Sequence, residues 1–156
     1  MQLLQIIDKH TRHPENLIHI LLEYQQGKEQ NFISEEDVML IANEMSISES
    51  RIYSVISFYS LFSTKPRGKY VIQVCSDVPC HVNGSLDVVK ELENKLKVKM
   101  GETTPDKVFS LEYTSCIGCC DKAPAIRIGS EMYSNLTASS IAEIITDFRR
   151  KYNENR

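Results

Sequence analysis

Two stretches hold all five cysteines of this 156-residue chain: CSDVPCHVNG at residues 75–84 and CIGCCDKAP at residues 116–124. The first contains a C-x4-C pair, the second contains a C-x3-C pair, and 35 residues separate the two pairs. A site that uses both pairs must therefore be assembled by folding. Thiolate sulfur is a soft ligand that selects zinc or iron–sulfur clusters, so this layout indicates a four-thiolate metal centre. Its candidate ligands are Cys75, Cys80, Cys116 and Cys120.

The spacing within each pair distinguishes two kinds of metal centre. Structural zinc sites often place two residues between ligands, because one small ion must be wrapped at close range. A [2Fe–2S] cluster is bulkier, and each of its two irons takes two cysteines. The wider C-x4-C and C-x3-C pairs favour the iron–sulfur cluster, with structural zinc as the alternative.

Residues 69–150 resemble the thioredoxin-like [2Fe–2S] ferredoxin domain of the 24 kDa subunit family of respiratory complex I. The shared pattern is C-x4-C followed later by C-[LI]-G-x-C-x-x-A-P, and GETTPD at residues 101–106 also matches. Residues 32–62 resemble the helical domain that precedes this ferredoxin, including its F-Y-x-x-F ending. One departure is Cys119, where the family commonly has a small, inert residue. The resemblance implies that the cluster ligands are Cys75, Cys80, Cys116 and Cys120.

The resemblance also implies a fold and a function. The expected fold is α+β, with an N-terminal helical bundle followed by a thioredoxin-like [2Fe–2S] domain. The expected function is that of an electron-transfer subunit, whose cluster exchanges single electrons with the FMN of an NADH-binding flavoprotein partner in a soluble multisubunit oxidoreductase. An electron-bifurcating hydrogenase is the favoured host, with complex I or an NAD-dependent formate dehydrogenase as alternatives. Further iron–sulfur or hydrogenase subunits are then expected as partners.

Charge and composition exclude several other functions. Eighteen basic and 21 acidic residues give a net charge of −3, and no basic stripe is interleaved with aromatics, so nucleic acid is not an expected partner. The six glycines lie too far apart to build a nucleotide-binding loop. We therefore expect NADH and FMN on the partner subunit only, and no catalytic residue or substrate site here. The N-terminus lacks a basic leader and no run approaches about 20 apolar residues, which predicts a cytoplasmic chain that does not span a membrane.

Other uses of the cysteines remain open from the sequence. Residues 116–119 also spell C-x-x-C, the motif of a redox-active dithiol, although residues 121–124 do not resemble the helix start that normally lowers the pKa of such a thiol. A protein of another class, a zinc-stapled adaptor that binds a partner without redox chemistry, is the second alternative. His81 beside Cys80 is interpreted as a solvated loop histidine.

The first 62 residues show helical periodicity and helix-start signals. Pro14 stands at a first helical position, and Ser34 and Ser48 are good N-caps. The expected core faces of the two capped helices are Val38, Ile41, Ala42, Met45, Ile52, Val55, Ile56 and Tyr59. The aromatic residues Phe58, Tyr59 and Phe62 are expected in the same core. Residues 63–68 are polar and contain both proline and glycine, which predicts a boundary between a helical domain at 1–66 and a second domain at 67–156.

The second half of the chain predicts the order β-α-β-β-β-α. A strand at 70–74 leads to Cys75, a helix covers about 85–97, and a strand at 108–113 leads towards Cys116. A hairpin is expected around residues 129–130, and a final helix after Thr137. Gly84 and Gly118 are expected to let backbone N–H groups approach the cysteine sulfurs.

Overall fold

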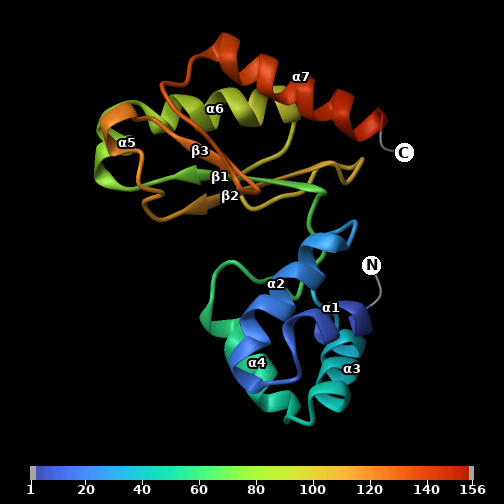
Figure 1. The fold of residues 1–156 in the computed structure, drawn as a ribbon. Coiled ribbons are helices and arrows are strands. Elements are labelled where there is room, and N and C mark those ends of the chain that lie inside the picture. Colours follow the sequence, from blue (N-terminus) through green and yellow to red (C-terminus); the bar gives the residue numbers. More distant parts are fainter. Residues whose placement is uncertain (1–2, 155–156) are drawn as a thin grey trace. The chain divides into compact units, whose positions relative to one another are not determined.

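A computed structural model describes residues 3–154, which form an α+β fold, as the sequence predicts. The chain divides into two compact units, Met1–Arg67 and Gly68–Arg156, which we call the helical unit and the sheet unit. Helices make up the first unit, whereas the second combines a sheet with helices (Figure 1). No helix within residues 3–154 is long and apolar enough to span a bilayer.

The helical unit is built from helices that begin at the predicted caps. Its described elements are α1 (Leu3–His10), the 3-10 turn η1 (Pro14–Asn16), α2 (Leu17–Gly27), α3 (Glu35–Met45) and α4 (Glu49–Phe58). Ser34 opens α3 with a capping box: its Oγ accepts the N–H of Asp37 at 3.3 Å, and its own N–H donates to the Asp37 carboxylate at 2.7 Å. Ser48 opens α4 by accepting the N–H of Arg51 at 3.4 Å. These bonds satisfy backbone donors that a helix start leaves free.

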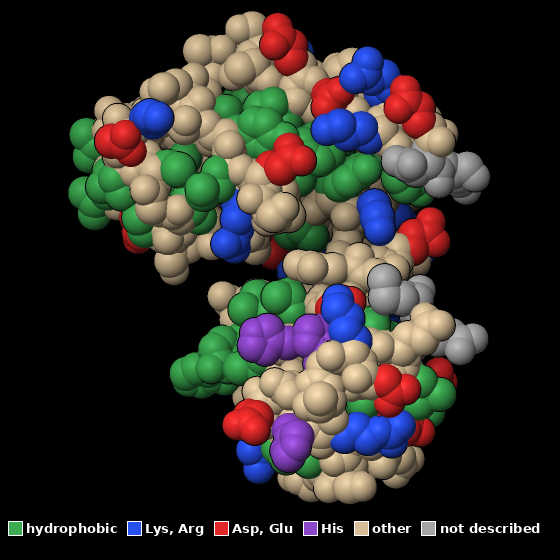
Figure 2. All heavy atoms as spheres, viewed as in Figure 1, with side chains coloured by type: hydrophobic (Ala, Val, Ile, Leu, Met, Phe, Trp, Pro, Cys, Tyr) green, Lys and Arg blue, Asp and Glu red, His purple; other side chains and the backbone are tan. Residues whose placement is uncertain are grey.

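The helical unit has an apolar core of its own, and one part of the expected core is wrong. Phe62 is buried, but Tyr59 is 37% exposed and Phe58 is 79% exposed. Phe58 is the last residue of α4 and lies two positions after the buried Ile56, so it points to the opposite side of the helix. Tyr59 follows the helix end, where helical periodicity no longer decides the direction of a side chain. Apolar side chains therefore lie on the surface near α4 (Figure 2). The residues of α3 and α4 that are buried as predicted are Val38, Ile41, Ala42, Met45, Ile52 and Ile56.

The sheet unit carries two helices on one face of a mixed sheet. Its described elements are β1 (Tyr70–Cys75), α5 (Val78–Val82), α6 (Ser85–Leu96), β2 (Phe109–Thr114), the 3-10 turn η2 (Cys120–Lys122), β3 (Ile126–Ile128), β4 (Glu131–Tyr133) and α7 (Ala138–Glu154). The strand order is β2-β1-β3-β4, with β1 parallel to β2 and β3 antiparallel to both of its neighbours. Helices α6 and α7 lie side by side over the sheet (Figure 1). The core between these helices and the sheet includes Ile72, Val74, Val89, Leu92, Phe109, Leu111, Ile126, Ile141 and Phe148.

Gly68 begins the sheet unit in close contact with β2. Its N–H donates to the buried Ser110 Oγ at 2.7 Å. A Cβ atom at this position would lie 2.5 Å from the carbonyl carbon of Phe109 and 2.8 Å from its nitrogen. Real Cβ atoms do not approach a backbone so closely, so only glycine fits where the chain enters the sheet.

The two edges of the sheet differ in how much free backbone they present. The segment at residues 101–104, which precedes β2 in the chain, pairs with the outer edge of β2. The N–H of Gly101 donates to the Leu111 carbonyl at 2.7 Å, and the N–H of Leu111 donates to the Glu102 carbonyl at 3.0 Å. The N–H of Thr104 then donates to the Phe109 carbonyl at 2.8 Å. The opposite edge is β4, which is only three residues long.

Candidate metal centre

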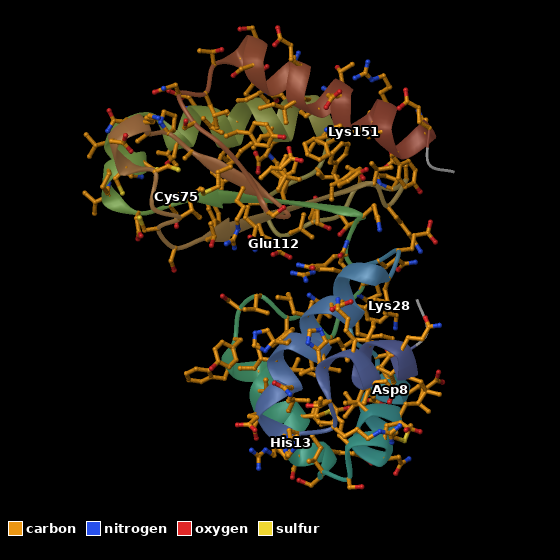
Figure 3. All side chains as sticks on the ribbon, viewed as in Figure 1. Asp8, His13, Lys28, Cys75, Glu112 and Lys151 are labelled. Carbon is orange, nitrogen blue, oxygen red and sulfur yellow. The ribbon has the colours of Figure 1, made fainter. Side chains whose placement is uncertain are left out.

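Parallel pairing of β1 and β2 brings the two cysteine stretches to the same end of the sheet. The carboxyl ends of parallel strands meet at one edge, and here the register pairs Cys75 with Thr114. Cys75 is the last residue of β1, as predicted, and Thr114 is the last of β2, two positions before Cys116. Figure 3 shows Cys75 at this end of β1. Stretches that are distant in sequence thus become neighbours through the strand register.

The first cysteine pair is buried. Cys75 is 1% exposed and Cys80, which lies within α5, is 2% exposed. Ala125 packs against both, and its carbonyl accepts the N–H of Cys75 at 3.2 Å. The sequence did not predict α5, because five residues are too few to show periodicity. Its two terminal residues, Val78 and Val82, are 74% and 76% exposed, so an apolar surface lies beside the pair (Figure 2).

The second cysteine pair lies at the surface. Cys116 and Cys120 are exposed, and their Sγ atoms are 3.3 Å apart. Two thiolates on one tetrahedral ion, each about 2.3 Å from it, lie about 3.8 Å apart. Within residues 3–154, no group of three or more His, Cys, Asp or Glu side chains converges on the position of one metal ion. The four candidate cysteines form two pairs, with Cys75 in contact with Cys80 and Cys116 in contact with Cys120.

The thiols of the two pairs influence one another electrostatically. Burial raises the pKa of the Cys80 thiol, and its hydrogen bond with Cys75 raises it further. The hydrogen bond with Cys116 is the main cause that raises the pKa of Cys120 to about 11. Charges on Cys75 and Cys116 also contribute to raising the pKa of both Cys80 and Cys120, so the two pairs lie within electrostatic range of each other. Deprotonating all of them requires a compensating positive charge, which a bound iron cluster supplies.

Asp77 connects the two cysteine stretches. Its carboxylate accepts the backbone N–H of Cys116 at 2.5 Å, across 39 residues of sequence. A second connection is the N–H of Ser76, which donates to the carbonyl of Thr114 at 3.1 Å. Asp77 was not predicted as a functional residue, because an aspartate inside a polar loop carries no sequence signal for such a distant partner.

The loop between Cys116 and Cys120 agrees with the prediction at Gly118. The N–H of Gly118 donates to Cys116 Sγ at 3.4 Å, with a φ of +86° that other residues rarely adopt. Cys119 is half-buried and packs on the first pair. Its Sγ lies 3.8 Å from the Sδ of Met132 on β4, so another sulfur already contacts this thiol.

Gly84, His81 and the C-x-x-C residues can each be compared with what the sequence predicted for them. The N–H of Gly84 donates to the carbonyl of His81 at 3.3 Å and not to a sulfur, so the expected approach of Gly84 to a ligand is wrong. The His81 side chain is exposed, as expected for a solvated histidine. After the C-x-x-C residues the backbone forms only the 3-10 turn η2, which gives no helix N-terminus to activate a dithiol.

We expect Asp77→Ala to speed the loss of the cluster, whereas Asp77→Asn should retain near-parental behaviour. The alanine variant removes the acceptor for the Cys116 N–H, whereas the asparagine variant keeps an oxygen there. At this partly exposed position the loss is worth about 1 kcal/mol, or roughly fivefold in rate. The measurement is the decay of visible cluster absorption in the presence of an iron chelator. Equal decay rates for the alanine variant and the parent protein would contradict this role.

The chain matches a known protein family and is similar to several known proteins. The family model for the thioredoxin-like [2Fe-2S] ferredoxin matches residues 3–149. A subunit of the NADH-quinone oxidoreductase of Rickettsia felis is 34% identical over 148 residues, which cover 94% of this chain and 89% of that protein. The NADP-reducing hydrogenase subunit HndA of Solidesulfovibrio fructosivorans is 35% identical over 108 residues, which cover 69% of this chain and 63% of that protein.

A solved structure shares the fold. The NAD+-reducing [NiFe]-hydrogenase in its air-oxidised state matches with a TM-score of 0.76 at 22% identity, over 91% of this chain and 24% of the hydrogenase chain. The fold therefore agrees with the thioredoxin-like architecture that the sequence resemblance implies. Since the family model extends over most of the chain, this protein belongs to the thioredoxin-like [2Fe-2S] ferredoxin family, and its cofactor is one [2Fe–2S] cluster.

Proposed function

We propose that this chain is an electron-transfer subunit, whose [2Fe–2S] cluster exchanges single electrons with the FMN of an NADH-binding flavoprotein partner. The observation that carries the proposal is the convergence of two cysteine pairs at one end of the sheet, one pair buried and the other exposed. An exposed pair brings one side of the cluster to the surface, where a partner cofactor can approach. The proposed ligands are Cys75, Cys80, Cys116 and Cys120.

Each proposed pair of ligands would hold one iron of the bound cluster. Cys116 and Cys120 have the sulfur separation that one iron requires, to within about half an ångström. Cys75 and Cys80 are in mutual contact and shielded from water. Cys119 is left out of the proposed ligand set, because its Sγ contacts Met132.

The bound cluster supplies reversible one-electron chemistry, and the surrounding chain stabilises its negative charge. The N–H of Gly118 donates to Cys116 Sγ, and a backbone hydrogen bond from Ala125 favours the thiolate of Cys80. Hydrogen bonds to the sulfurs stabilise the reduced state more than the oxidised state, because reduction adds one negative charge. Burial of the first pair limits the access of water to one side of the cluster.

The relatives support a host complex that uses NAD(H) or NADP(H). One relative belongs to an NADH-quinone oxidoreductase and another belongs to an NADP-reducing hydrogenase. The first match covers more of both chains, which favours a complex of the NADH-quinone oxidoreductase type over the electron-bifurcating hydrogenase that the sequence resemblance favoured. The second match keeps a hydrogenase, including the electron-bifurcating type, as the other candidate host. In either host we propose a cytoplasmic position and no substrate site on this chain. Its partners would be the flavoprotein and further iron–sulfur or hydrogenase subunits.

The test is NADH-driven reduction of a dye by the anaerobically purified, cluster-loaded chain, with and without its co-purifying flavoprotein. We expect a brown protein that dithionite bleaches, no turnover by the chain alone, and turnover with the flavoprotein present. Steady NADH oxidation by the chain alone would overturn the proposal. A colourless protein with one zinc per chain would overturn it in favour of the adaptor alternative. The co-purifying polypeptides then distinguish the hosts.

A further inference from the structure

We propose that Cys116 and Cys120 are also a site of reversible oxidation: when the cluster is absent, they form a disulfide that prevents the cluster from being inserted. This inference rests on the ligand set of the proposed function, since it assigns a second chemistry to two of those ligands. It predicts that the chain must be reduced before it can be loaded.

The separation of the two sulfurs favours this reaction. Cys116 Sγ and Cys120 Sγ are 3.3 Å apart, and a disulfide bond is about 2.05 Å long, so each sulfur needs to move by well under 1 Å. Both residues lie outside the strands, one after the end of β2 and the other at the start of η2. The side chains can therefore approach each other without disturbing the strand pairing that defines the sheet.

Exposure distinguishes this pair from the other cysteines. The sulfurs of Cys75 and Cys80 also contact each other, but these residues are 1% and 2% exposed, so a dissolved oxidant does not reach them in the folded chain. Cys119 is half-buried and its Sγ contacts Met132. Cysteine oxidation follows thiolate character and access to the sulfur, and access distinguishes the surface pair from the other cysteines.

Hydrogen peroxide is the oxidant that we assign to disulfide formation between Cys116 and Cys120. The Cys116 thiol reacts with one peroxide molecule, forming a sulfenic acid and releasing one water molecule. The Cys120 thiol then attacks the sulfenic sulfur, a sulfur–sulfur bond forms, and a second water molecule leaves. Two electrons pass from the two thiols to the peroxide. A dithiol reductant reverses the change by thiol–disulfide exchange, restoring both thiols and becoming a cyclic disulfide itself.

The disulfide has a direct consequence for metal binding, because only thiolate sulfur ligates the metal. Forming it removes both ligands of one iron and leaves the buried pair unchanged. A chain oxidised in this way cannot complete the four-thiolate set until it is reduced. In the loaded chain the same sulfurs are bound to iron, so the bridge does not form while the cluster is intact.

The test uses the full-length chain, freed of its cluster and of reductant under argon and then treated with one equivalent of hydrogen peroxide. Remaining thiols are alkylated, and the mass is measured intact and after digestion. We expect a loss of about 2 Da and alkylation of Cys75, Cys80 and Cys119. Cadmium, which forms absorbing thiolate complexes, should give about half of the thiolate-to-metal absorption of the reduced chain, and a dithiol should restore the rest.

Two variants assign the bond, since residues 116, 119 and 120 lie on one tryptic peptide. Cys119→Ser should still lose about 2 Da, whereas the Cys116–Cys120 bond cannot form in Cys120→Ser. The inference fails if Cys119→Ser prevents the disulfide, if the bond joins Cys75 and Cys80, or if all five cysteines oxidise without preference. Iron content of the reduced, loaded chain tests the ligand set separately, so failure of the disulfide leaves the proposed function standing.

Discussion

Replacing Cys120 by alanine is expected to abolish stable cluster binding, whereas replacing Cys119 by alanine should leave the cluster in place. Cys120 Sγ lies 3.3 Å from Cys116 Sγ, close to the separation of two thiolates on one iron. Cys119 Sγ lies 3.8 Å from the Met132 sulfur instead. Without Cys120, one iron keeps a single protein ligand, so most of the bound iron should be lost.

Iron content and the EPR signal of the dithionite-reduced protein measure this difference. The Cys119→Ala variant should match the parent in both. If Cys119 replaces the missing ligand in Cys120→Ala, a weaker cluster with altered g-values should appear, and it should vanish in the double variant. The opposite result, with the cluster abolished in Cys119→Ala and intact in Cys120→Ala, would make the second motif a C-x-x-C ligand pair.

Gly68→Ala is expected to destabilise the sheet unit by about 3 kcal/mol, the upper end of the usual cost of overpacking. The added Cβ would lie 2.5 Å from the Phe109 carbonyl carbon, and this neighbour is strand backbone, which cannot rotate away. Phe109 is fully buried and pairs with Tyr70 across β1 and β2, so moving it disturbs the core and the strand register together.

Loss of the cluster's visible absorption during denaturant unfolding reports on the sheet unit. The midpoint is the quantity to compare, since a chain with two compact units need not unfold in one step. Gly27→Ala is the control: it adds a Cβ at the end of α2, in the helical unit, where no atom of another segment lies within 4 Å, so the midpoint of the sheet unit should stay near the parent value. Similar midpoints for the two variants would refute the packing argument.

Local signals in the sequence were enough to predict most elements. Ser34 and Ser48 mark helix starts through bonds to residues three positions away, and the alternation at 70–74 predicts β1. The C-x4-C and C-x3-C spacings likewise indicated two ligand pairs, but the meeting of the two pairs depends on the β1–β2 register. Capping and periodicity describe contacts within a few positions of the chain, and these are the features that the sequence predicted.

The features that the sequence did not predict depend on distant partners or on short elements. The bond from the Cys116 N–H to Asp77 joins residues 39 positions apart. Helix α5 has only five residues, too few to show a period. Phe58 was expected in the core because of its spacing to Tyr59 and Phe62, yet its ring is 79% exposed and contacts Tyr59 edge-on. It is the last residue of α4 and lies two positions after the buried Ile56, which places it on the other side of the helix.

The covered edge of β2 and the shortness of β4 affect how this protein associates with other chains. Exposed strand edges recruit further strands and promote aggregation, and proteins counter this with covered or very short edges. Here the segment around Gly101 and Glu102 occupies the backbone of β2, and the three residues of β4 offer little backbone to a newcomer. The sheet edges are thus protected against uncontrolled strand addition. We therefore expect any protein that binds this chain to contact its side-chain surfaces and not to add a strand to its sheet.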